Sequence, residues 1–119
     1  AELAASRALD PQSRRRLQGA LDAVRSAEGP ARRTADSRLH ILIGELSGSP
    51  TLSASVAEVQ GRLDELLAAI PVFARNIAHS DHQHDAFVRA ILRGQPTAAR
   101  TAMADHVEGT AALLRGLLT

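Results

Sequence analysis

The chain has 119 residues, a formal net charge of +1 and no cysteine. This length suits one compact domain, and the lack of cysteine excludes disulfide frameworks and thiolate sites, so a metal would need His, Asp or Glu ligands. The near-neutral charge, with two Phe as the only aromatic residues, disfavours a dedicated nucleic-acid-binding domain.

The first elements are marked by proline residues that follow capping residues. Residues 2–9 offer barely two helical turns without a cap, and we interpret them as a truncated helix. Asp10-Pro11 opens a helix that ends near Gly29, and another runs from about Ala31 to Gly48. Pro at the first helical position sacrifices no backbone hydrogen bond, so each such proline predicts a helix start.

A long third helix is predicted from Pro50 to about His79. Its apolar residues recur at helical spacing, and Pro71 is expected to kink it or to end its first half. Ser80, with Gln83 three residues later, predicts a capping box that opens a further helix.

That further helix is expected to stop at Gly94, and a last helix runs from Pro96 to about Leu118. No alternating apolar pattern indicates a strand. Residues 1–119 are therefore predicted to form a single all-α domain, an antiparallel bundle of about six helices.

Asp36 and His40 form the first candidate ligand pair. They are four residues apart on a predicted helix, so both side chains project from one face about one turn apart. The same spacing also arises by chance in ordinary surface hydrogen bonds, and the pair alone does not define a metal site.

His84 and His106 strengthen the case because each lies eleven residues from Gln95, in the predicted turn between the last two helices. At ~1.5 Å rise per residue, both lie ~16 Å from that turn on antiparallel neighbours and can face each other. Both also fall on apolar faces. His79 and His82 are not preferred as ligands, and His82 is expected to be solvated.

Three imidazoles and one carboxylate in an aliphatic core are costly unless they satisfy one another or bind a cation. This donor set suits a divalent transition metal, and Zn, Ni, Mn and Fe(II) all remain open. The alternative is a metal-free network in which Asp36 accepts hydrogen bonds from the imidazoles.

The sequence resembles a known family, the effector-binding (FCD) domain of FadR-type regulators within the GntR family of bacterial transcription factors. The resemblance spans nearly the whole chain and is most specific toward its end. It is carried by the following segments: Ala1-Glu2-Leu3-Ala4-Ala5, Asp36-Ser37-Arg38-Leu39-His40, Ser47-Gly48-Ser49-Pro50, Gln83-His84, Ala90-Ile91, Gly94, Ala98-Ala99, Met103 and His106.

The resemblance implies a helical bundle that holds a metal in its interior, with a small carboxylate effector contacting the ion. Asp36, His40, His84 and His106 match the family's metal ligands. Such regulators carry an N-terminal winged-helix DNA-binding domain that nothing in this chain resembles, so DNA would be bound only through that separate domain. The chain departs from the family at several positions: Leu39 for Phe, Ser49 for Asn, Gln83 for Glu and Gln95 for Asp.

The leading hypothesis is therefore an allosteric effector-binding module and not an enzyme. Arg62 and, second, Arg33 are the candidate partners for an anionic effector, because Arg can clasp a carboxylate through two hydrogen bonds. The alternatives are a metal-free dimerisation or acyl-ligand-binding domain, and a small metallohydrolase.

The remaining expectations concern location and assembly. No apolar run approaches the ~18 residues of a membrane span, and no secretory signal is present, so we expect a soluble, cytoplasmic protein without membrane contact. A homodimer is the expected assembly.

Overall fold

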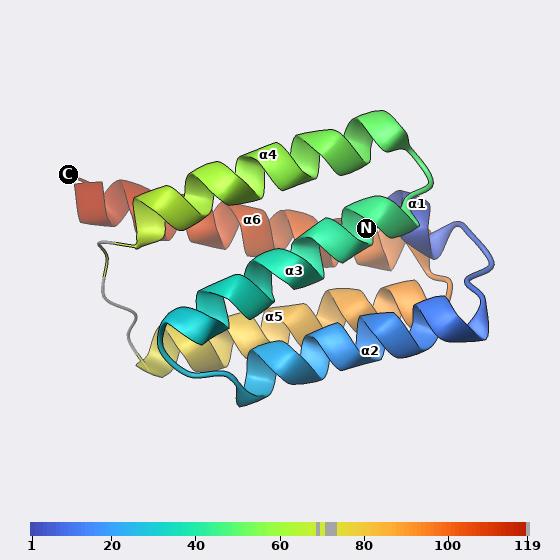
Figure 1. Ribbon diagram of the computed structural model, residues 1–119, viewed down its shortest axis with the longest axis horizontal. Helices are drawn as coiled ribbons and strands as arrows, with labels where there is room; N and C mark the ends of the chain where they lie inside the picture. The colour runs from blue at the N-terminus through green and yellow to red at the C-terminus, as the bar shows by residue number, and fades with distance from the viewer. Residues whose placement is uncertain (69, 71–73, 119) are drawn as a thin grey trace.

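The computed structural model describes residues 1–68, 70 and 74–118, and in these residues it contains six helices and no strand. The helices are α1 (Glu2–Ala5), α2 (Pro11–Ser26), α3 (Pro30–Leu46), α4 (Pro50–Leu67), α5 (Ala74–Leu92) and α6 (Pro96–Leu118). The predicted all-α bundle is confirmed. From α2 to α6, successive helices run in alternating directions (Figure 1).

The proline punctuation places the helix starts correctly. Pro11, Pro30, Pro50 and Pro96 each occupy the first position of a helix. The side chain of Asp10 accepts a hydrogen bond from the Ser13 backbone N–H at 2.7 Å, which satisfies one of the free N–H groups at the start of α2. These local signals account for the starts of α2, α3, α4 and α6.

The boundary between the third and fourth predicted helices is wrong. Instead of a helix reaching His79 and a new one opening at Ser80, α4 ends at Leu67 and α5 runs without interruption from Ala74. Ser80 lies inside α5, where its Oγ contacts His84 Nε2 at 3.3 Å, so it caps no helix. Pro71 lies outside the described residues.

The core lies where α2, α3, α5 and α1 meet. The α2–α3, α3–α4 and α5–α6 pairs pack side by side, α2 also contacts α5, and α1 contacts α3, α5 and α6. The largest fully buried apolar side chains are Phe87, Leu17, Leu21, Leu39, Ile91, Val24 and Val88. α4 differs from α2, α3, α5 and α6, because among the described helices it packs only on α3.

Two glycines allow a tight turn between α5 and α6 and a close contact between α3 and α4. Gly94 has φ of +64°, a left-handed conformation that lets the chain turn tightly from α5 into α6. Gly44 has no side chain at the α3–α4 contact, where an added Cβ would lie 3.2 Å from the Cβ of Val56. α3 and α4 therefore approach each other closely at this point.

Candidate metal centre

The four predicted ligands come together from three helices. Asp36 and His40 lie on α3, His84 on α5 and His106 on α6. One ligand atom from each lies within 4.8 Å of the others. The equal distances from the α5–α6 turn correctly predicted that two imidazoles face each other, since the ring centroids of His84 and His106 are 4.8 Å apart.

Asp36 is the shared partner in this cluster. Its Oδ1 lies 2.9 Å from Nε2 of His84 on α5 and 3.6 Å from Nε2 of His40, one turn along α3. One carboxylate oxygen therefore faces imidazoles from two helices. The spacing of Asp36 and His40 places both side chains on the face of α3 that looks toward α5.

The imidazoles form a compact group on an aromatic base. The rings of His40 and His106 stack at 5.2 Å with an interplanar angle of 10°. Phe87 lies 5.7, 5.5 and 5.6 Å from the ring centroids of His40, His84 and His106, respectively. Phe87 is 0% exposed, so the cluster packs on one side against a buried apolar ring. Leu39 stands where the family pattern has Phe, and the aromatic ring that packs on the cluster comes from Phe87 instead.

The cluster favours an ionised carboxylate. Burial opposes the charged form of Asp36, but hydrogen bonds and favourable charge interactions with His40 and His84 outweigh it, so the pKa of Asp36 is lowered well below its ordinary value. The carboxylate is therefore available as an anionic oxygen ligand at neutral pH.

His106 is held in its neutral form. Burial, followed by unfavourable interactions with the charged forms of His40 and His84, lowers the pKa of His106 to about 4. A neutral imidazole carries a free lone pair, which is what a metal requires of a histidine ligand.

The side chains present do not satisfy one another fully. Among the described residues, the buried Nδ1 atom of His84 has no hydrogen-bond partner. This observation disfavours a self-contained network in which Asp36 accepts from the imidazoles. The spread of 4.8 Å is compatible with a metal, because opposite ligands of an ion at ~2.1 Å are roughly 4.2 Å apart, a distance reached by small side-chain adjustments.

Gln83 is a neighbour of the cluster whose role the sequence did not reveal. The sequence predicts it as half of a capping box, yet its Oε1 lies 2.7 Å from Nδ1 of His106 on α6. The capping pattern Ser-x-x-Gln hid this contact, because the pattern is local and the partner is 23 residues away. The tight α5–α6 turn, which sets the register of the two helices, was the signal that could have found it.

The two candidate effector arginines have partners outside the four-residue cluster. Arg62 forms an ion pair with Glu58 at 2.8 Å on the outer face of α4, and its side chain is 78% exposed. Arg33, part-buried on α3, donates a hydrogen bond to the Ile70 carbonyl. Their contact with an effector stays a prediction.

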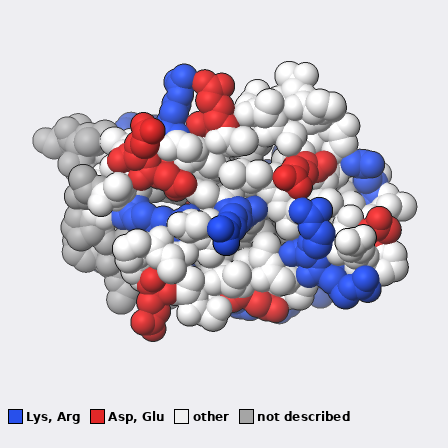
Figure 2. Space-filling model, viewed as in Figure 1, with Lys and Arg blue, Asp and Glu red and all other residues white. Residues whose placement is uncertain are grey.

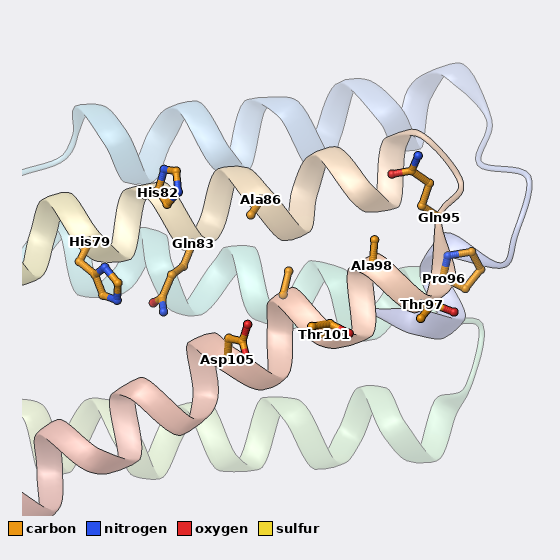
Figure 3. Close-up of a pocket in the computed structure, with 11 residues that line it drawn as sticks. His79, His82, Gln83, Ala86, Gln95, Pro96, Thr97, Ala98, Thr101 and Asp105 are labelled. Atoms are coloured by element: carbon orange, nitrogen blue, oxygen red, sulfur yellow. The ribbon is translucent and has the colours of Figure 1, made fainter.

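A hollow lies on the outside of the α5–α6 pair, with a volume of about 1110 Å³ (Figure 3). His79 and His82 line it, and both are exposed, as expected for His82. It contains none of the four clustered ligands, but Gln83 belongs to its wall. We therefore place the candidate centre inside the bundle and treat the hollow as the outer surface beside it.

Comparison with known proteins agrees with this architecture. No described helix has the length and hydropathy needed to cross a membrane. No curated protein and no solved structure matches the chain. The model of the FCD domain, which is the effector-binding domain of GntR-family transcription regulators, matches residues 1–109. The chain therefore belongs to the FCD domain family.

Proposed function

We propose that this chain is a metal-containing effector-sensing domain of a FadR-type GntR regulator. In this proposal Asp36, His40, His84 and His106 hold one divalent transition metal, and a small organic acid binds at the ion. The observation that carries the proposal is the convergence of four ligand atoms within 4.8 Å from three helices. Binding of the acid then controls a separate winged-helix domain, through which alone the regulator contacts DNA.

The donor set indicates what the centre binds. Three imidazole nitrogens and one carboxylate oxygen suit Zn, Ni, Mn or Fe(II), and an ion that accepts more than four ligands keeps positions for oxygen ligands. A dication with one bound carboxylate and three neutral imidazoles retains a net charge of +1. Burial of His84, His106 and Phe87 strengthens its attraction for an anion, which favours a carboxylate effector.

The placement of the ligands supports allosteric control. Because α3, α5 and α6 each supply a ligand, an effector that shifts the ion shifts the helices relative to one another. Couplings of ~1 to 3 kcal/mol suffice for regulation, so small helix movements are enough. We propose that the regulator acts as a cytoplasmic homodimer, with the DNA-binding domain responding to these movements.

Binding explains the centre better than catalysis. Hydrolysis at a metal usually needs a separate general acid or base near the ion. Glu45 pairs with Arg16 at 3.3 Å on the outer surface of α2 and α3, and Glu108 is exposed on α6. Neither carboxylate belongs to the cluster, so we propose a non-enzymatic domain.

The first test is metal content. We expect protein purified without an affinity tag to contain close to one transition metal per chain, and Asp36→Ala to lose it because the anionic ligand is removed. Asp22→Ala is the matched control, since Asp22 is exposed on α2 and its side chain accepts a hydrogen bond from the exposed Gln18. Elemental analysis measures both variants. Wild-type protein that takes up no metal after incubation with Zn, Ni, Mn or Fe(II) would contradict the proposal.

The second test is effector binding. Native mass spectrometry should reveal any acid that co-purifies, and calorimetric titration with a panel of mono- and dicarboxylates follows. We expect heat of binding with the metal-loaded protein and none with the metal-free or Asp36→Ala protein. Equal carboxylate affinity with and without metal would place the effector away from the ion and refute this part of the proposal.

A further inference from the structure

Gln83 connects two neighbouring ligands of the candidate centre. It precedes His84 in α5, but its side chain points toward α6 (Figure 3). There its Oε1 lies 2.7 Å from Nδ1 of His106, a short and direct contact. The same residue therefore bridges the two helices at the level of the cluster.

This contact determines which nitrogen of His106 is free. A neutral imidazole protonates one nitrogen and leaves a lone pair on the other, and the partner of the first nitrogen sets the choice. With Nδ1–H donating to the Gln83 amide oxygen, the lone pair lies on Nε2. Metal-bound histidines are commonly oriented in this way by an acceptor at the second ring nitrogen.

We propose that Gln83 is a positioning residue that fixes the tautomer and the ring orientation of His106 for metal binding. This inference rests on the proposed function. The amide is a neutral acceptor, so it orients the imidazole without adding a second negative charge beside Asp36. A divalent ion held by three neutral imidazoles and a single carboxylate would then keep a net charge of +1, which attracts an acidic effector.

The position of Gln83 makes the proposal testable without damage to the core. Gln83 is only partly buried and lines the outer hollow, whereas His84 beside it is fully buried. Gln95 lines the same hollow, is exposed, and has no side-chain contact with the four clustered residues. It therefore provides a matched control.

The first experiment compares wild type, Gln83→Leu, Gln83→Glu and Gln95→Leu by competitive titration with Co²⁺, followed by absorption. We expect Gln83→Leu to bind Co²⁺ about 10- to 100-fold more weakly, as for other lost supports of ligating histidines. Gln83→Glu should keep the wild-type affinity or exceed it, because a carboxylate also accepts from Nδ1–H. Gln95→Leu should match wild type.

The second experiment reads the tautomer directly in metal-free protein, by ¹⁵N NMR of the histidine rings. Wild type and Gln83→Glu should show His106 protonated at Nδ1, and Gln83→Leu should shift population to the Nε2-protonated form. A general loss of structure would change the ring signals of all five histidines and not those of His106 alone.

Two outcomes would overturn the role of Gln83: an unchanged tautomer and affinity in Gln83→Leu, or a Gln83→Glu variant as weak as Gln83→Leu. If wild-type protein bound no metal, the proposed function would fail, while the tautomer measurement would still decide whether Gln83 orients His106.

Discussion

At the residue scale, the interior depends on one carboxylate placed among three imidazoles. Asp36 faces His84 at 2.9 Å and His40 at 3.6 Å, whereas His106 is supported from the other side by Gln83. Asp36 thus contacts two of the imidazoles, and Gln83 contacts the third. A change at one ligand should weaken metal binding without unfolding the apolar base around Phe87.

The first prediction concerns acid sensitivity of the metal-free protein. The pKa of His106 is about 4 in the folded chain against 6.5 in the reference state. Between these values the unfolded chain binds the additional proton, so stability rises with pH and is lost as pH falls from about 6.5 toward 4. The contribution is at most about 3 kcal/mol.

Urea unfolding across this pH range, in the presence of a chelator, measures the effect. His106→Gln should flatten the dependence, because the group that titrates is removed. His82→Gln, a substitution at an exposed histidine, should leave it unchanged. A wild-type protein equally stable at pH 4.5 and pH 7 would contradict the neutral, buried state of His106.

Much of the cluster was predictable at this scale, and part of it was not. Asp36 and His40 are related by helix periodicity, and His84 and His106 by their equal distance from a turn, which are both local or nearly local rules. The contacts of Gln83 and Ser80 were missed because each residue fits a capping pattern. In the folded chain both side chains contact histidines of the cluster instead of capping a helix start.

At the element scale, α3 and α4 approach each other closely at Gly44. The absent side chain of Gly44 lets Val56 approach the α3 backbone. We predict that Gly44→Leu destabilises the fold by about 1 to 3 kcal/mol, because the added side chain overpacks this contact. Chemical denaturation measures the change.

Gly19→Leu is the control for this substitution. Gly19 lies on the exposed side of α2, and nothing lies within 4 Å of its added Cβ. Here the higher helix propensity of Leu should stabilise the chain by about 0.5 kcal/mol. Equal effects of the two substitutions would show that α3 and α4 are not in close contact at Gly44.

The sequence predicts the helix starts at proline residues more reliably than the boundary between α4 and α5. Pro11, Pro30, Pro50 and Pro96 restrict the backbone directly, so their effect is local. The capping box at Ser80 could form only if a helix began there, but α5 already begins at Ala74 and continues through Ser80. Arg32 shows the same limit: it is 9% exposed and bonds the Val24 carbonyl and Asp81, contacts that no local pattern announces.

At the scale of the whole molecule, the centre joins separate parts of the chain. Its candidate ligands span residues 36 to 106 and come from α3, α5 and α6, three helices that α1 also contacts. A bound metal should therefore stabilise the complete domain. Charged side chains of both signs are dispersed over the visible face, which is not dominated by either charge (Figure 2).

We predict a metal-dependent melting temperature. A metal that binds only the folded chain, at 100 times its Kd, adds about 2.7 kcal/mol, which is roughly 10 °C for a domain of this size. Differential scanning calorimetry with Zn²⁺ or a chelator measures the shift. Asp36→Ala should show almost none, and a shift of equal size in that variant would indicate that the metal binds elsewhere.

The attachment of α4 to a single neighbour has a mechanical consequence. Among the described helices, α4 packs on α3 alone and supplies none of the four candidate ligands, while Leu52, Val59 and Leu66 on its surface remain exposed. Fewer contacts must break to release it than to release a helix held on several sides. We therefore expect α4 to detach from the bundle more readily than the helices that surround the four-residue cluster. Amide hydrogens should exchange most slowly in those helices and faster in α4.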